Sequence, residues 1–190
     1  MKDLGLMHYF LGLEVWQSPG EIYLSRGKYV VKLLEIVAMA ECKSMHTPME
    51  MNFKKLCGKV AWPYLENPTE YRQLIGALMI LVNTRPDICF VVNTLSQYMI
   101  DLFHAHWIVE KHVLKYLHGT INLGLKYTAK NVRLHGYTDV DWVGNSADRK
   151  ITSKCYFSLG FAMISWIRRK QKFVALSTAE VEYIAASIAT

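Results

Sequence analysis

The chain has 190 residues, of which 52% are hydrophobic and 20% are charged. This length and composition support one large or two small packed domains and argue against a disordered protein. The formal net charge of +6 favours polyanionic partners. The longest apolar candidate for a membrane span, residues 74–92, is broken by Asn83, Arg85 and Asp87, and the N-terminus lacks the apolar core of a signal peptide. We therefore expect an intracellular protein, cytoplasmic or nuclear, that is not secreted and has no membrane partner.

The N-terminal part alternates apolar and polar residues as a β-hairpin does. Tyr9–Trp16 is predicted as one strand, Ser18–Gly20 as the turn and Glu21–Leu24 as the returning strand. Apolar residues then recur at helical intervals over Lys28–Ala40, which predicts a helix. The proline-containing and irregular segment 41–67 follows, and it predicts a linker or an extended wrap across another surface.

The middle of the chain is typical of helices, and strands follow it. A buried helix is predicted from Thr69 to the turn 84–87, and Pro86 in that turn favours a second helix over Asp87–Met99. A third helix is predicted over Trp107–His118, with Gly119 as its C-terminal stop. Four strands are predicted from their β-forming residues, at 123–127, 132–139, 155–159 and 162–168.

Histidine and cysteine give no strong metal signal. The four cysteines form no Cys-x-x-Cys pair and have no zinc-ligand spacing with histidine, so free thiols in a reducing compartment are expected. His104 and His106 flank one alanine, which favours a polar helix entry over a metal site. The cysteines are Cys42, Cys57, Cys89 and Cys155.

Carboxylates near the C-terminal end form the best candidate for a metal site. Asp139 and Asp141 share one face of a predicted strand, because residues two apart in an extended chain point the same way. Ser177 and Glu180 form a capping box that predicts the start of a helix, and Glu182 lies in its early turns. A strand carboxylate and a helix carboxylate of this kind can hold metal ions.

Two other sequence patterns lie near these carboxylates, and neither establishes a binding site by itself. The spacing Asp139-x-Asp141-x-x-Gly144 begins like a calcium loop, but Val143 and Lys150 stand where that loop needs oxygen ligands, which argues against it. The basic run 168–172 fits either phosphate contacts or a solvated hairpin tip, and its residues alone leave both interpretations open.

Strings along the whole chain resemble the Pol polyprotein of copia-type (Ty1/copia) LTR retrotransposons, from the end of the reverse transcriptase into the ribonuclease H domain. Each string is weak alone, but their shared order is specific. The strings are Met1–Gly5 with His8–Val15, Tyr71–Gly76, Thr84–Ile88, Tyr116–Thr120, Asp148–Lys150 and Val174–Glu180.

The resemblance implies a mixed α+β (α/β) fold in three parts. Residues 1–68 correspond to the end of the reverse transcriptase palm and thumb, with a primer-grip-like hairpin, a helix and a linker. Residues 69–130 correspond to a helical connection-like segment, and residues 131–190 to a truncated ribonuclease H-like domain, an incomplete sheet with one helix. Its first strand would keep one bare edge.

The resemblance also implies site residues. Phe10-Leu11-Gly12 corresponds to the hairpin that holds the primer terminus, whereas the polymerase's aromatic-x-Asp-Asp turn is absent from this sequence. Asp139 matches the first catalytic aspartate of ribonuclease H and Glu182 its catalytic glutamate, with Glu180 as the alternative. Asp139 and Glu182 would both bind Mg²⁺, the cofactor that the resemblance implies. The expected nucleic-acid contacts in the basic run are Arg168, Arg169, Lys170 and Lys172.

The sequence departs from the family pattern in ways that bear on activity. Lys154 stands where the family usually has glycine, and Ile151 where it usually has serine. The family's two remaining aspartates would lie beyond Thr190, so Mg²⁺ binding is expected to be weak or absent. We therefore expect a Pol fragment that is ancestrally an RNA–DNA hybrid ribonuclease H joined to a reverse transcriptase, and inactive as it stands. Its expected partners are RNA–DNA hybrid or other nucleic acid and the rest of Pol.

Two alternatives remain open from the sequence. The chain could be a non-catalytic nucleic-acid-binding remnant that uses the basic run and the primer-grip-like hairpin. It could also be a pseudogene product without function.

Overall fold

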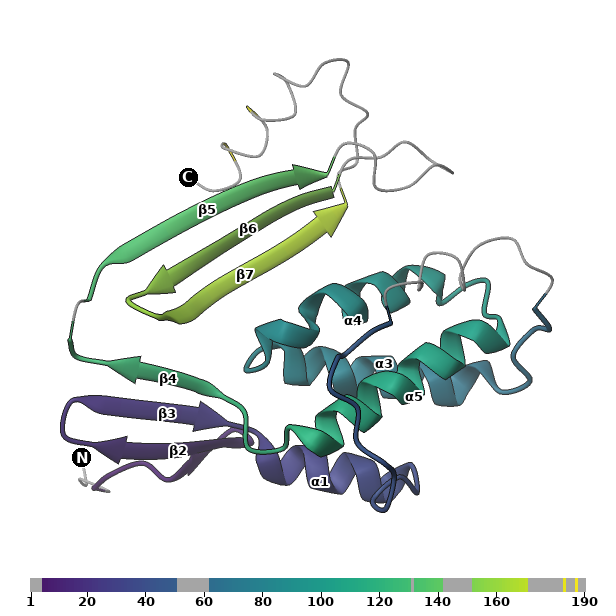
Figure 1. The fold of residues 1–190 in the computed structure, drawn as a ribbon, viewed down its shortest axis with the longest axis horizontal. Helices are drawn as coiled ribbons and strands as arrows, with labels where there is room; N and C mark the ends of the chain where they lie inside the picture. Colours follow the sequence, from purple (N-terminus) through teal and green to yellow (C-terminus); the bar gives the residue numbers. More distant parts are fainter. Residues whose placement is uncertain are drawn as a thin grey trace. The chain divides into compact units, whose positions relative to one another are not determined.

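The computed structural model describes residues 5–50, 62–130, 132–141 and 152–170, together with Tyr183 and Ser187. The chain divides into two compact units (Figure 1). The first comprises 1–17 with 23–125, and the second comprises 18–22 with 126–190. In the described residues the fold is mixed α+β, with two antiparallel sheets and four α-helices, which confirms the predicted class.

The first predicted N-terminal strand is divided in the structure, and the returning strand lies where it was predicted. The expected strand 9–16 is two strands, β1 (Tyr9–Phe10) and β2 (Leu13–Ser18), and β3 (Glu21–Ser25) follows. Phe10 pairs with Leu13, so Leu11 and Gly12 alone make the turn. Both have positive φ, 49° and 79°, which is the geometry of the two-residue hairpin turn that alternation of apolar residues does not reveal.

Helix α1 (Gly27–Ile36) begins and ends on contacts that the helical periodicity could not show. Its N-terminus is capped from β2, because the Glu14 carboxylate accepts the Lys28 amide at 3.0 Å. Its C-terminus comes four residues before the predicted Ala40. Ala38 adopts a left-handed φ of 54°, and the Met39 amide donates back to the Leu34 carbonyl at 2.8 Å. These bonds form a Schellman motif, which ends the helix.

The helices of the middle segment follow in chain order. They are α3 (Pro68–Val82), the 3₁₀ turn η1 (Pro86–Ile88), α4 (Cys89–Leu95), the 3₁₀ turn η2 (Ser96–Tyr98) and α5 (His104–Gly119). Asn67, not Thr69, caps α3 by accepting the Glu70 amide at 3.4 Å. Gly119 is the last residue of α5 rather than its stop, because Thr120 is the C-cap.

The predicted second helix, 87–99, is therefore wrong as a single element. Side chains along it bond to backbone carbonyls one turn earlier: Asn93 to Cys89 at 2.9 Å and Ser96 to Asn93 at 2.9 Å. Such bonds compete with the helical ladder. The segment accordingly tightens into 3₁₀ geometry at its end, from Ser96.

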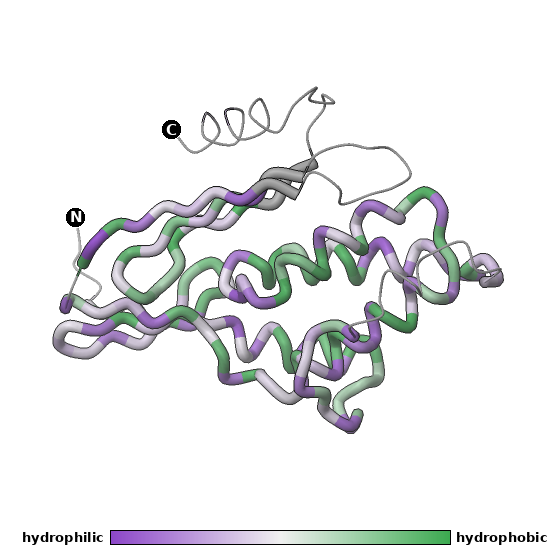
Figure 2. The backbone as a smooth tube through the Cα atoms, turned by 45° about the horizontal axis from the view of Figure 1, so that its top comes forward, coloured by the Kyte–Doolittle hydropathy of each residue, from purple (hydrophilic) through white to green (hydrophobic). Residues whose placement is uncertain are grey.

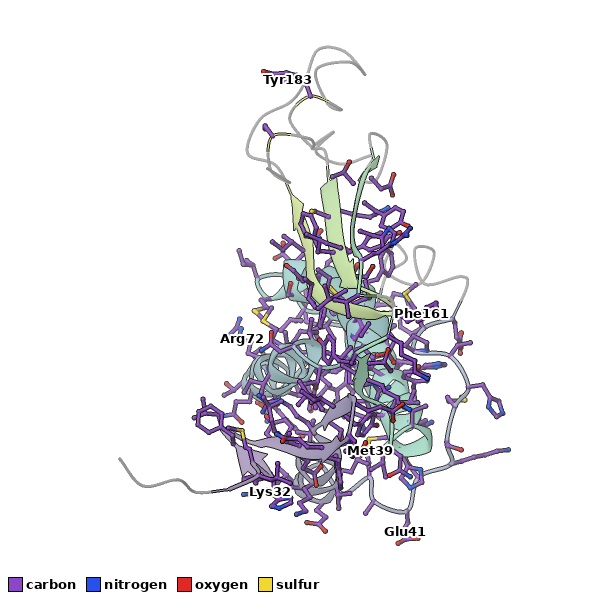
Figure 3. The ribbon with its side chains drawn as sticks, turned by 90° about the vertical axis from the view of Figure 1, so that its left-hand side faces the viewer. Lys32, Met39, Glu41, Arg72, Phe161 and Tyr183 are labelled. Atoms are coloured by element: carbon purple, nitrogen blue, oxygen red, sulfur yellow. The ribbon has the colours of Figure 1, made fainter. Side chains whose placement is uncertain are left out.

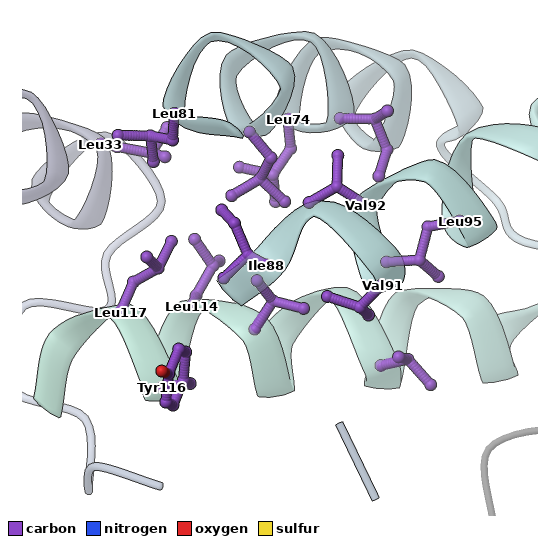
Figure 4. Close-up of a cluster of buried hydrophobic side chains, with 14 of the residues drawn as sticks. Leu33, Leu74, Leu81, Ile88, Val91, Val92, Leu95, Leu114, Tyr116 and Leu117 are labelled. Atoms are coloured by element: carbon purple, nitrogen blue, oxygen red, sulfur yellow. The ribbon is translucent and has the colours of Figure 1, made fainter. Parts of the chain in front are cut away.

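Buried apolar residues from α1, α3, α4 and α5 make one hydrophobic core (Figure 4). Along these helices apolar and polar residues alternate, as expected where only one face is buried (Figure 2). On α5 the residues expected to face inward are buried, namely Val109, Val113, Tyr116 and Leu117. Of the two lysines expected to face outward, Lys111 is exposed and Lys115 is half-buried. Fully buried members of the core include Tyr71, Ile75, Leu78, Leu81, Leu95, Leu114 and Leu117.

A buried arginine joins three segments of this unit. The Arg85 side chain, 3% exposed, donates to both oxygens of Asp87, the shortest bond being 2.7 Å. It also donates to the Thr120 carbonyl at 2.9 Å and to the Thr120 hydroxyl at 2.8 Å. The Tyr116 hydroxyl donates to Asp87 at 2.8 Å. Burial favours the protonated form of Asp87, but its bonds and attraction to Arg85, with the Tyr116 hydroxyl, keep its pKa below the usual value.

Two buried polar groups lie one helical turn apart on α5. Glu110 is fully buried, and neither of its carboxylate oxygens has a partner among the described residues. His106 is 1% exposed, its ring stacks on Tyr98 at 4.2 Å, and its Nδ1 accepts the Phe103 amide at 3.1 Å. The predicted polar helix entry therefore fits His104, which begins α5, whereas His106 belongs to the interior.

Burial shifts the two pKa values in opposite directions. It raises the pKa of Glu110 to about 9, with a smaller contribution from the charge of Glu70, and it lowers the pKa of His106 to about 4. Glu110 is therefore protonated and His106 is neutral in the folded protein at neutral pH.

The second unit holds the hairpin tip 18–22, most of β4 (Leu125–Thr128) and a three-stranded sheet. The Ala129 amide donates to the Gly20 carbonyl at 2.8 Å, and the Tyr127 hydroxyl donates to the Met163 carbonyl at 2.7 Å. The three-stranded sheet comprises β5 (Leu134–Asp141), β6 (Thr152–Leu159) and β7 (Ala162–Lys170), in that order. All three lie where the sequence predicts strands.

Strand β5 is at the edge of this sheet among the described residues, as expected for the first strand. The helix predicted from Ser177 falls outside the described residues, except for Tyr183 and Ser187, which are helical. None of the helices in the described part of the chain has the length and apolar character that a bilayer crossing requires.

We predict that Arg85→Gln lowers the free energy of unfolding by about 3 kcal/mol, because it leaves the Asp87 carboxylate and the Thr120 carbonyl without their donor. Urea denaturation measures the change. Arg72→Gln is the matched control, since Arg72 is exposed (Figure 3) and, among the described residues, donates to the Met99 carbonyl. It should cost less than about 1 kcal/mol. Equal losses in the two variants would contradict a special role for Arg85.

A second prediction concerns pH. Below the unfolded pKa of Glu110 its protonated form is present in both states, so its stabilising effect is complete there and is lost as pH rises toward 9. His106 acts oppositely, and adds stability as pH rises from 4 to 6.5. The two effects offset each other at mildly acidic pH. Above that, Glu110 alone lowers the free energy of unfolding by up to about 1.4 kcal/mol per pH unit.

Glu110→Gln tests this prediction, because the amide keeps the shape of the carboxylic acid and does not titrate. Urea unfolding across the pH range should show that the decline in stability above neutral pH disappears. A rise in stability between pH 4 and 6.5, which Glu110 offsets in the wild type, should then appear, because His106 is unchanged. A variant that keeps the alkaline decline would show that another group causes it.

Candidate nucleic-acid interface and carboxylate site

Asp139 is the one predicted catalytic residue whose side chain the structure describes. It lies on β5 directly opposite Lys154 of β6. The Lys154 ammonium donates to Asp139 Oδ2 at 2.8 Å. The two side chains are 64% and 34% exposed, so the pair is solvated and contributes little to stability. The lysine that departs from the family's usual glycine is therefore the residue that neutralises Asp139.

The other predicted carboxylates cannot be located in the same way. Glu180 and Glu182 lie outside the described residues, and of Asp141 only the backbone, at the end of β5, is described. In the described ranges no group of three or more His, Cys, Asp or Glu side chains could hold a metal ion. Mg²⁺ binds through carboxylates and retained water, and a single carboxylate already paired with an ammonium does not fit it. The described residues therefore do not fit the implied ion.

The basic run falls partly within β7. Arg168, Arg169 and Lys170 pair with Lys154, Ser153 and Thr152 of β6, so these three are strand residues rather than a hairpin tip. Their side chains and all of Lys172 lie outside the described residues. Their contact with nucleic acid remains a prediction.

The primer-grip-like turn is an exposed feature of the first unit. Phe10 is 51% and Leu11 77% exposed, although both are apolar. Leu11 has a left-handed backbone, which costs a residue with a Cβ about 1 kcal/mol. Gly12 has a φ of 79°, which a residue with a Cβ rarely adopts, and it lies against the movable end of the Arg26 side chain. The turn thus presents two apolar side chains beside a cation.

A groove of about 650 Å³ that the sequence did not indicate is lined by residues of β2, β3 and α1. The Trp16 and Tyr23 rings, 5.4 Å apart, line it together with Lys28 and Lys32. Glu14 also lines the groove, and its buried carboxylate accepts the Lys28 amide and the Ser25 hydroxyl. The sequence feature that could have indicated this site is the Glu14 carboxylate within the apolar run Leu13–Trp16, because a buried carboxylate needs a partner.

Cys42 and Cys155 carry free thiols, as predicted. Cys57 lies outside the described residues.

Known proteins similar to this chain cover nearly all of it. The uncharacterized mitochondrial protein AtMg00810 of Arabidopsis thaliana is 37% identical over 99% of this chain and 78% of its own length. The retrovirus-related Pol polyprotein from transposon RE2 of the same plant is 40% identical over 96% of the chain. The retrovirus-related Pol polyprotein from transposon TNT 1-94 of Nicotiana tabacum is 35% identical over 98% of it.

The chain spans only part of the polyproteins, 12% of the RE2 polyprotein and 15% of the TNT 1-94 polyprotein. No family model matches it, and no solved structure matches it. The chain belongs to the family of Pol polyproteins of copia-type retrotransposons.

Proposed function

We propose that this chain is the segment of a Pol polyprotein that joins the end of a reverse transcriptase to the first part of a ribonuclease H-like nuclease. We further propose that by itself it does not cleave an RNA–DNA hybrid. The order of the family strings supports the assignment. So does the position of Asp139, on the first strand of an antiparallel sheet that follows a helical unit.

The three predicted parts, 1–68, 69–130 and 131–190, are proposed here as functional segments. The first two share one hydrophobic core, because α1 packs with α3, α4 and α5. We therefore assign the primer-grip-like turn and the helical connection to a single folded body. The nuclease-like part begins after β4.

The Asp139–Lys154 ion pair is the observation that carries the proposed lack of cleavage. Ribonuclease H chemistry uses two divalent ions held by several carboxylates, which stabilise the attacking and leaving oxygens. The Lys154 ammonium places a positive charge beside Asp139, as a metal ion would. Unlike a metal ion, an ammonium has no coordination position for a substrate oxygen. Lys154 thus neutralises the carboxylate without providing the ion's chemistry.

We predict that the purified chain, incubated with labelled RNA–DNA hybrid and Mg²⁺, cleaves no more than its Asp139→Asn variant. Gel electrophoresis of the labelled RNA measures the products. The two proteins should match because Asp139 is neutralised in both. Cleavage by the wild-type chain that Asp139→Asn abolishes would contradict the proposal, because it would require an intact set of metal ligands.

A further prediction concerns Lys154 itself. Lys154→Thr removes the ammonium and keeps a strand-forming residue, so Asp139 should attract a divalent cation about tenfold more strongly. Line broadening of β5 amide signals by Mn²⁺ in NMR spectra measures this attraction.

Lys126→Thr is the matched control for Lys154→Thr. Lys126 forms an ion pair of similar exposure with Glu21 at 2.9 Å. Neither residue belongs to the three-stranded sheet. The control should leave the Mn²⁺ effect on β5 unchanged. If Lys154→Thr behaves like the control, then Lys154 does not compete with cations at Asp139.

A further inference from the structure

A small hollow lies at the start of β5, at the opposite end of that strand from Asp139. It has a volume of about 340 Å³ and is lined by Arg133, His135, Gly160 and Phe161. The turn between β6 and β7 forms one side, where Gly160 has a φ of 61°. The Gly160 amide donates to the Arg133 carbonyl at 2.8 Å, which holds the turn against the start of β5.

The side chains of this hollow are suited to a phosphate and a base. Arg133 and His135 offer nitrogen donors, and no carboxylate is among the described residues that line the hollow. Phe161 is 92% exposed at the hairpin turn (Figure 3), so its ring is open to a ligand rather than packed in a core. A cationic arginine and a further nitrogen donor beside an open aromatic ring are the elements with which proteins bind unpaired nucleotides.

The same face of the sheet continues toward Asp139 with another aromatic feature. His135, Tyr137 and Asp139 share a face of β5, since alternate residues of a strand point the same way. Tyr137 lies opposite Tyr156 of β6, and their rings stack at 4.8 Å with an angle of 16°. Both tyrosines are exposed, at 51% and 38%. The hollow, the tyrosine pair and the Asp139–Lys154 pair therefore follow one another along β5.

We propose that the hollow and the tyrosine pair bind one unpaired nucleic-acid strand, with a phosphate at Arg133 and His135 and a base on the Phe161 ring. Asp139 lies four positions after His135 on β5. At about 3.4 Å per strand residue, and about the same rise per stacked nucleotide, a bound strand would pass Asp139 about four nucleotides from the hollow. This inference rests on the proposed function, and it adds a strand-binding site to the nuclease-like segment.

The test uses the whole chain and a short oligothymidylate that carries a fluorescent label at one end, with binding followed by fluorescence anisotropy. Phe161→Leu keeps an apolar side chain and loses the aromatic face, so it should weaken binding about fivefold or more. Phe161→Tyr should bind like the wild type. If Phe161→Leu also binds like the wild type, the stacking role is wrong.

The phosphate contact is tested by the salt dependence of binding. Arg133→Gln should reduce the slope of log K against log salt by about 0.7, the value for one phosphate of a single strand. Lys130→Gln is the matched control, because Lys130 is exposed, carries the same charge and does not line the hollow. It should leave the slope unchanged. Equal changes in both variants would show diffuse attraction by net charge and would overturn the site.

Competitors distinguish the chemistry of the ligand. Uridine monophosphate should displace the oligonucleotide at lower concentration than inorganic phosphate, because only the nucleotide can stack on Phe161. Equal competition would reduce the hollow to an anion site, and stronger competition by an acidic peptide would assign it to a protein partner. Either result overturns the proposal.

Phe161→Leu separates this inference from the proposed function. It should weaken binding to oligothymidylate but leave the Mn²⁺ effect at Asp139 as in the wild type, because Phe161 lies at the opposite end of β5 from Asp139. The hollow can therefore fail while the results for cleavage and Mn²⁺ hold, and the reverse is equally visible.

Discussion

The buried guanidinium of Arg85 is the contact on which the helical unit depends. It binds Asp87 at the start of η1 and the backbone and side chain of Thr120 at the end of α5, so it joins segments 35 residues apart. A buried charge is tolerated only when its donors are satisfied, and these bonds therefore fix where α5 ends.

The second unit depends on a different kind of charge contact. The Asp139–Lys154 pair is solvated, so its effect on stability is small, but it changes the chemistry of the carboxylate. We propose that Asp139 corresponds to the family's metal-binding aspartate, and Lys154 places a neutralising charge beside it. The basic and aromatic side chains along β5 do not need that ion. The nucleic-acid-binding surface that we propose can therefore remain where the catalytic chemistry is absent.

Much of this fold follows from local sequence patterns, and the errors have physical causes. The strands β5, β6 and β7 and the helix α5 were predicted because their patterns are regular. The end of α1 was not, since it depends on the left-handed Ala38. Buried Glu110 could have been found, because it continues the apolar face of α5 with Val113 and Leu117. The ion pair of Asp139 with Lys154 needed the register of β5 against β6, which neither strand specifies alone.

The central claim is that Lys154, and not a metal ion, neutralises Asp139. A crystal structure of the chain grown with Mn²⁺ tests it most directly, because the anomalous scattering of manganese locates bound ions. We expect a hydrogen bond between the Lys154 ammonium and the Asp139 carboxylate, and no anomalous peak beside them. A peak that links Asp139 to a second carboxylate, with Lys154 turned away, would contradict it.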